Sequence, residues 1–223
     1  RIEFANDITV RMMVQHRSGL PNFTDTPDYW STPTSDQHKQ LSLMLDRPAR
    51  FEPDTSYEYS NSNYLLLKKI IEHISQLSFN EYLTRHILTP LGLKHTYTSL
   101  NDVDINRVMG GYYVGYNENI KANNYGSMLA TAEDVAIFAR ALSTGQLLSA
   151  KAQRIYSSLY EFEHGGLLPG YQSYVKYHKE LDAVIVQVIN TTDFAGYDWN
   201  LSQITYSRMT QIISNRITDT HSM

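Results

Sequence analysis

The chain has 223 residues, of which 42% are hydrophobic and 19% charged, and these proportions are those of an ordinary globular protein. The net charge of -4 is spread along the sequence without a basic run, so we expect no nucleic acid partner. No apolar stretch approaches the roughly 18 to 20 residues that cross a bilayer, so we predict no membrane span in this chain. The absence of cysteine excludes disulfides and thiolate metal sites.

The first half of the chain is predicted to be mainly helical. Thr9 is a suitable N-cap for a first helix, which stops near Gly19. From Ser62, apolar residues recur at helical spacing, and Ser78 to Glu81 form a capping-box sequence at the start of a later helix. The helices predicted here cover residues 10–16, 37–45, 62 through 74, and 79 to just before Pro90.

The pattern of the second half changes from helical to alternating. Thr131 to Asp134 begin a helix, and Gly145 stands where its C-terminal cap should be. Residues 171–179 and 183–190 then predict two strands of an antiparallel hairpin. A last amphipathic helix over roughly 201–217 is expected to cover one face of that sheet.

This order of elements predicts an α+β fold. The chain is long enough for one sizeable core or for two small, interleaved lobes. We predict one catalytic-type domain over residues 1–223. Within it, residues 8–144 form a mainly helical lobe, and residues 145–223 form a sheet lobe with the C-terminal helix.

Two short segments carry residues suited to catalysis. Tyr59-Ser60-Asn61 precedes a predicted helix, and His164-Gly165-Gly166 precedes the predicted hairpin. Each is a weak signal by itself, because such residues are common in turns. Their surroundings make them specific: the segments around them resemble class C β-lactamases and the related carboxypeptidases and esterases. The segments that carry this resemblance are 8–10, 16–20, 51–64, 70–73, 90–93, 126–134 and 164–171.

The resemblance implies a β-lactamase/transpeptidase-like fold and acyl transfer by a serine. Tyr59 would share with a lysine the role of base toward the serine, because an alcohol is a weak nucleophile at its own pKa. Asn61 would orient that lysine and hold a substrate carbonyl or amide. His164 would supply positive potential or a hydrogen bond toward the carboxylate end of the substrate, in a pH-sensitive way.

The resemblance also implies a substrate-binding strand at Gly165, Gly166 and Leu167. Gly166 has no Cβ, so a substrate backbone can lie against the strand. The backbone N–H of Leu167 would be one oxyanion-hole donor, and the other would come from the serine itself. The other seven histidines show no metal-ligand spacing, so we predict packing or surface roles for them, no metal and no cofactor.

The serine-lysine motif itself is not found where this chemistry needs it. The pattern Ser-x-x-Lys occurs at Ser173 to Lys176, but there it lies in a predicted strand, where residues three apart point to opposite faces. We therefore expect the nucleophile and the first sheet strands to lie upstream of Arg1, in a longer protein of which this chain is a fragment. The interval from Gly145 to His164 is also shorter than in the family, which indicates a trimmed sheet edge or missing residues.

The predicted function is that of a serine hydrolase. It would act through an acyl-enzyme on the carbonyl of a β-lactam, a D-alanyl-D-alanine-type peptide or an ester. Its partners would be a small-molecule or peptidoglycan-type substrate and the upstream segment of the same protein, and the resemblance implies export to the periplasm or cell exterior. The alternative is a non-catalytic, penicillin-binding-like protein that binds ligand without covalent chemistry.

Overall fold

The computed structural model describes residues 1–159, 163–194 and 199–220, with side chains except at 163–164, 199–201 and 217–220. The chain forms two compact units that are interleaved along the sequence. Unit 1 comprises residues 1–102, 123–129 and 151–160, and unit 2 comprises residues 103–122, 130–150 and 161–223. Helix α6 (Ala132–Ser143), which the sequence assigned to the helical lobe, thus belongs to the unit that contains the sheet.

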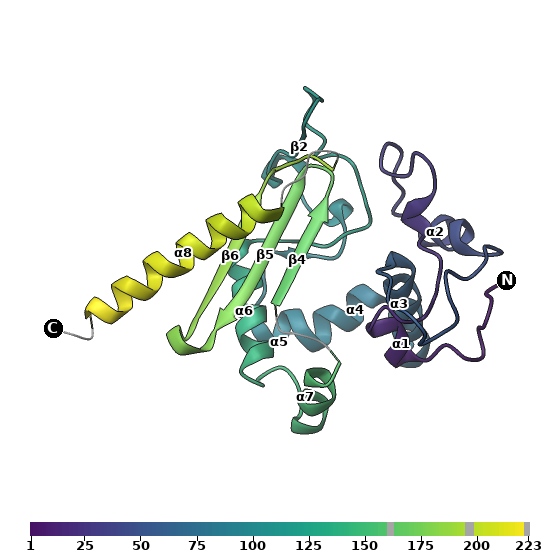
Figure 1. Ribbon diagram of the computed structural model, residues 1–223, viewed down its shortest axis with the longest axis horizontal. Helices are drawn as coiled ribbons and strands as arrows, with labels where there is room; N and C mark the ends of the chain where they lie inside the picture. Colours follow the sequence, from purple (N-terminus) through teal and green to yellow (C-terminus); the bar gives the residue numbers. More distant parts are fainter. Residues whose placement is uncertain (160–162, 195–198, 221–223) are drawn as a thin grey trace. The chain divides into compact units, whose positions relative to one another are not determined.

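Unit 1 is mainly helical (Figure 1). Thr9 caps the first helix as predicted, since its side chain accepts a hydrogen bond from the Met12 N–H. The predicted capping box at Ser78 and Glu81 is also present. The elements of this unit include α1 (Val10–Val14), the 3-10 turn η1 (Phe23–Asp25), α2 (Gln37–Met44), α3 (Asn61–Ser75), α4 (Phe79–Leu83), η2 (Thr84–Leu88), α5 (Thr89–Leu91), β1 (Thr96–Tyr97) and η3 (Leu100–Asp102).

One predicted helix end is wrong. The helix that starts at Phe79 does not stop before Pro90 but continues through the π-helical turn η2 into α5 and ends at Gly92, whose φ is +68°. Pro90 lies in the first turn of α5, where the lack of a backbone N–H costs little hydrogen-bonding energy. The wider turn before it lets the chain continue past the proline ring.

The core of unit 1 fixes the segment before α3 against that helix. Leu20 and Phe23 are buried, and they belong to one hydrophobic cluster with Leu65 of α3 and Met44 of α2. Met44 is only 1% exposed. Residues 16–24 are therefore held along the N-terminal part of α3, where the first predicted motif lies.

Unit 2 is built on a three-stranded sheet in the order β4 (Glu163–Leu168), β5 (Tyr171–His178) and β6 (Ala183–Ile189). Both strand pairs are antiparallel, as predicted for the hairpin of β5 and β6. The remaining elements of unit 2 are η4 (Ile105–Arg107), β2 (Tyr112–Tyr113), the 3-10 turn η5 (Lys179–Leu181), β7 (Thr191–Thr192) and α8 (Trp199–Thr220). Strand β3 (Leu129–Ala130) spans the boundary between the two units, and α7 (Ala150–Ser157) belongs to unit 1 from Lys151 onward. Helix α7 and the parallel pair of β2 with β7 were not predicted.

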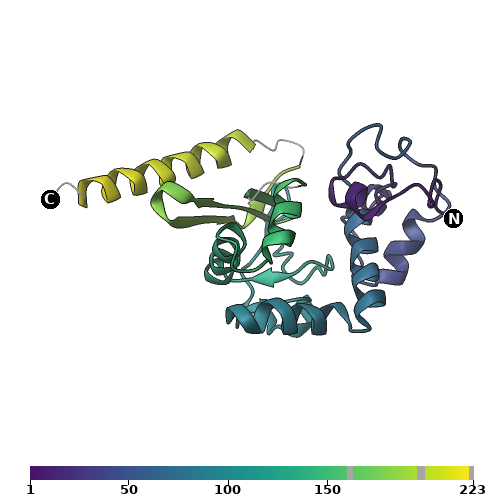
Figure 2. The same ribbon diagram turned by 90° about the horizontal axis from the view of Figure 1, so that it is seen from below.

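Helix α8 covers one face of this sheet, as predicted. The Tyr206 ring packs edge-on against Tyr174 with centroids 4.6 Å apart, and its hydroxyl lies 2.9 Å from His178 Nε2. Gln187 of β6 donates a hydrogen bond to the Ser202 hydroxyl at 2.6 Å. Figure 2 shows the sheet between α8 and α6. Among the described residues, no helix is both long and apolar enough to cross a membrane.

Candidate active site

The first predicted motif forms the N-terminal end of α3. Ser60 is the N-cap residue, and its hydroxyl accepts a hydrogen bond from the Ser62 N–H. Tyr59 and Asn61 therefore stand on either side of the cap, one before the helix and one in its first turn. A helix start has fixed backbone geometry, so both side chains leave the chain from defined positions.

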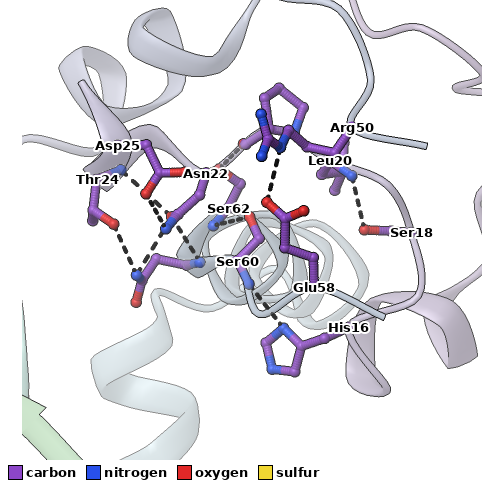
Figure 3. Close-up of polar contacts among 12 residues, drawn as sticks. His16, Ser18, Leu20, Asn22, Thr24, Asp25, Arg50, Glu58, Ser60 and Ser62 are labelled. Carbon is purple, nitrogen blue, oxygen red and sulfur yellow. Dashed lines mark hydrogen bonds and ion pairs between the residues drawn. The ribbon is translucent and has the colours of Figure 1, made fainter. Parts of the chain in front are cut away.

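The side chain of His16 is hydrogen-bonded to the N-cap residue of this helix (Figure 3). Its Nδ1 atom accepts a hydrogen bond from the Ser60 N–H at 3.2 Å and lies 3.2 Å from Asn63 Nδ2. Its Nε2 atom lies 3.4 Å from the Tyr64 hydroxyl. His16 is 2% exposed and has a φ of +55°, a backbone region that histidine and asparagine occupy more readily than most residues.

These contacts define the protonation state of His16. A backbone N–H can only donate, so Nδ1 must be the unprotonated nitrogen and Nε2 must carry the proton. Burial lowers the pKa of His16, because the charged ring would lose its hydration. The imidazole is thus neutral at neutral pH, with Nε2–H directed to the Tyr64 hydroxyl.

The Tyr59 ring lies against the His16 ring. Their centroids are 4.3 Å apart and their planes differ by 27°, which is a stacked arrangement. Tyr64 approaches the same histidine edge-on at 5.2 Å. Tyr59 is nevertheless 49% exposed, so it is anchored along one face while the rest of the side chain meets solvent.

The Asn61 side chain is fixed in one orientation by Asn22. The Asn22 carbonyl oxygen accepts hydrogen bonds from the backbone N–H groups of Thr24 and Asn61, at 3.4 and 3.0 Å. Its amide nitrogen donates to Asp25 at 3.0 Å, so the oxygen and nitrogen of Asn22 are assigned without ambiguity.

As a consequence, Asn61 presents its carbonyl oxygen. The Asn61 Nδ2 atom donates to Asn22 Oδ1 at 3.4 Å and to Thr24 Oγ1 at 3.2 Å, which uses both of its hydrogens. Among the described residues, no hydrogen bond involves Asn61 Oδ1. This geometry suits an ammonium group or a substrate N–H. The expected roles of Asn61, to orient a lysine and to hold a substrate carbonyl or amide, stay predictions.

A buried polar layer lies beneath the motif. The Ser62 hydroxyl donates to the Pro21 carbonyl at 2.7 Å and accepts from the Phe23 N–H at 3.1 Å. The Ser18 hydroxyl donates to Asn63 Oδ1 at 2.6 Å. Ser62 and Asn63 are both 0% exposed. Buried polar groups that are all paired fix a single arrangement, so this layer locks residues 18–23 onto the start of α3.

Residues 50–58 form backbone hydrogen bonds with residues 16–19. The Arg50 N–H donates to the Gly19 carbonyl at 2.8 Å, and the Glu58 N–H donates to the His16 carbonyl at 3.0 Å. The two chains approach so closely at Gly19 that a Cβ there would lie 2.0 Å from the Phe51 carbonyl oxygen. Gly19 is therefore required both by its φ of +71° and by this contact.

The second predicted motif lies on β4, at the edge of the three-stranded sheet. Gly166 is paired with Ser173, and Leu167 with Gln172, so the backbone of the predicted substrate-binding strand is regular. The side chains of Glu163 and His164 lie outside the described part of the structure, and the role of His164 stays a prediction. Tyr59 and Asn61 belong to unit 1, and β4 to unit 2.

Ser173 and Lys176 both lie on β5 and pair with different residues of β4, Gly166 and Glu163. On a strand, residues three apart point to opposite faces. This Ser-x-x-Lys is thus not the helical arrangement that a nucleophile needs. Among the described residues, no group of three or more His, Asp or Glu side chains could hold a metal ion.

The sequence reasoning missed two residues of this site, Asn22 and Thr24, and assigned His16 only to packing or the surface. The signal for Asn22 was present, since an asparagine two residues after the segment 16–20 can bridge turn backbone and side chains. The partner of His16 could not be read from the sequence, because 44 residues separate it from Ser60.

The comparisons with known proteins agree with this architecture. The solved structure of D-amino acid amidase from Ochrobactrum anthropi SV3 with L-phenylalanine amide superposes with a TM-score of 0.80 at 20% identity, covering 98% of this chain and 74% of that one. The penicillin binding protein from Bacillus halodurans gives a TM-score of 0.71 at 18% identity, over 83% and 68% of the two chains. These similarities show the fold.

Sequence relatives cover shorter stretches. Penicillin-binding protein 4* of Bacillus subtilis (strain 168) is 27% identical over 126 residues, which is 53% of this chain and 27% of that protein. Protein flp of Staphylococcus aureus (strain MW2) is 30% identical over 89 residues, which is 40% of this chain and 18% of that protein. The family model described as Beta-lactamase matches residues 3–210. The chain therefore belongs to the β-lactamase family.

Proposed function

We propose that this chain forms part of a serine hydrolase that acts through an acyl-enzyme. The observation that carries this proposal is the start of α3, where a half-exposed Tyr59 and an Asn61 whose amide nitrogen is engaged by Asn22 and Thr24 flank the Ser60 cap. In the proposal, the phenol of Tyr59 and the amide oxygen of Asn61 share a lysine ammonium. That pairing is the proton-handling group that serine attack and leaving-group departure require.

In this proposal Tyr59 accepts the proton of the nucleophilic serine and returns it to the leaving group. Asn61 Oδ1 orients the lysine ammonium or accepts a hydrogen bond from a substrate N–H. The serine and lysine come from residues outside this sequence, because the Ser-x-x-Lys at Ser173 is on a strand. The edge strand β4 would receive the substrate backbone along Gly165 and Gly166, with Leu167 N–H as oxyanion donor.

The substrate class we propose is a carbonyl in a β-lactam, a D-alanyl-D-alanine-type peptide or an ester. The β-lactamase family and the relatives named as penicillin-binding proteins support this class. A solved relative named as a D-amino acid amidase also supports an amide bond beside a D-residue. We also propose that the protein works outside the cytoplasm, on peptidoglycan-type peptides.

The test is the intact mass of the full-length protein before and after incubation with benzylpenicillin. We expect a mass increase of one penicillin per chain, and a D-alanine release assay then examines peptide substrates. Tyr59→Phe removes the proton acceptor and should slow acylation by about 10²- to 10⁴-fold, because general base catalysis contributes that much. Reversible penicillin binding without any mass increase would contradict the proposal and favour a non-catalytic binding protein.

A further inference from the structure

We propose that His16 is a positioning residue for Tyr59. Its ring provides the surface on which the phenol lies, and its Nδ1 atom holds the backbone of the motif. This inference rests on the proposed function, in which Tyr59 carries protons. Its distinctive claim is that the orientation of Tyr59 depends on a neutral imidazole in one tautomer.

The first support is that one buried ring contacts both parts of the motif. His16 stacks on Tyr59 at 4.3 Å and accepts the N–H of the next residue, Ser60, at 3.2 Å. A residue that held only the backbone would leave the tyrosine ring free to change rotamer. A residue that only stacked would leave the buried Ser60 N–H without an acceptor, which is costly.

The second support is that His16 is itself rigidly held. It is 2% exposed, its carbonyl accepts the Glu58 N–H at 3.0 Å, and its ring touches Tyr64 and Asn63. A positioning residue transmits a fixed geometry only if its own rotamer is fixed by its surroundings. The polar layer at Ser18 and Asn63 supplies that constraint.

Protonation of His16 would break this arrangement. A proton on Nδ1 would face the Ser60 N–H, donor against donor, so the charged ring cannot keep its place. The titratable groups that face the ring are the phenols of Tyr57, Tyr59 and Tyr64. The charged neighbours Arg17 and Glu58 are each in an ion pair, with Asp54 and Arg50 respectively.

Two variants of the full-length protein separate the two contacts of His16. His16→Asn keeps an acceptor near the Nδ1 position and tolerates the positive φ, but it removes the stacked ring. His16→Phe keeps a ring and removes the acceptor. Met44→Ala is the control, because it opens the buried core of unit 1 without touching Tyr59.

The first readout is the NMR signal of the Tyr59 ring, assigned with Tyr59→Phe, and it does not depend on catalysis. In the wild type we expect the Tyr59 and His16 signals to titrate with the same acidic midpoint. In His16→Asn that step should disappear, and the Tyr59 signal should move toward that of a solvent-exposed tyrosine. Met44→Ala should leave the signal and its midpoint in place.

The second readout is the rate of acylation by a fluorescent penicillin, per folded molecule. We expect losses of about 10- to 100-fold in both His16 variants, because small displacements of a catalytic group cost that much. Met44→Ala should stay within about threefold of the wild type. A wild-type Tyr59 signal in His16→Asn, or equal effects in Met44→Ala, would overturn the inference. A wild type that takes up no penicillin overturns the proposed function alone, because the Tyr59 signal still decides the role of His16.

Discussion

Gly19 offers the sharpest test of how the site is held. Its φ is +71°, and a Cβ at this position would lie 2.0 Å from the carbonyl oxygen of Phe51, which is backbone and cannot rotate away. Gly19→Ala therefore meets two separate penalties. The first is the left-handed backbone conformation, and the second is the collision with the chain that follows α2.

The size of the effect can be worked out from these two terms. A residue with a Cβ in the left-handed region costs roughly 1–2 kcal/mol. The collision must push residues 50–51 away, which breaks the hydrogen bond from Arg50 N–H to the Gly19 carbonyl, 2.8 Å long, and leaves its groups to find other partners. A net hydrogen bond contributes about 1 kcal/mol and overpacking costs about 1–3 kcal/mol, so the total destabilisation is about 3–6 kcal/mol.

Gly92→Ala is the matched control. Gly92 has nearly the same φ, +68°, but no atom lies within 4 Å of the Cβ that alanine would add. It should therefore carry only the backbone term of roughly 1–2 kcal/mol. Urea unfolding of the full-length protein, read by tryptophan fluorescence and analysed at equal slope, gives both free energies of unfolding. Equal losses in the two variants would refute the close approach at Gly19.

Three further predictions follow from the site. Burial keeps the pKa of His16 in the folded protein below the ordinary 6.5. The free energy of unfolding should therefore fall as the pH drops from about 6.5 toward that lower pKa, because the unfolded chain binds the proton more readily. In urea unfolding at a series of acidic pH values, His16→Asn should show a weaker pH dependence than the wild type. Asn22→Ala should slow penicillin acylation by about 10- to 100-fold by freeing the Asn61 amide, whereas Asp25→Asn, which keeps an acceptor oxygen, should have a small effect in the same assay. Ser173→Ala should still take up one penicillin per chain by intact mass, and loss of the adduct would reinstate Ser173 as nucleophile.

The sequence predicted correctly those elements that are determined by residues close together in the chain. The caps at Thr9 and Ser78 and the hairpin at 171–189 depend on neighbouring residues, and the structure confirms them. Pro90 was misread because a proline is compatible with the first turn of a new helical segment, and only the π-helical turn before it makes room. A rule about one residue cannot foresee how the preceding turn adapts.

The site was predicted in its residue types but not in its supports. Tyr59 and Asn61 could be named from their motif, whereas their contacts come from residues 37 to 44 positions earlier, such as Asn22, Thr24 and His16. Loop conformations in residues 16–24 bring these groups together, and periodicity carries no information about such contacts. The sequence could therefore propose what Asn61 does but not which of its atoms is left to do it.

The polar residues from 59 to 63 fall into two groups, one with a structural role and one with a proposed functional role. Ser60, Ser62 and Asn63 are at most 2% exposed, and each is tied to the cap or to residues 16–23, so their identities follow from folding alone. Tyr59 is half-exposed, and the carbonyl oxygen of Asn61 accepts no hydrogen bond from the described residues, since only its amide nitrogen is bonded. Folding accounts for the Tyr59 ring, which stacks on His16, and for the Asn61 amide nitrogen, which donates to Asn22 and Thr24, but not for the Asn61 carbonyl oxygen. These two side chains are therefore the part of the motif that we expect to meet the substrate and the lysine.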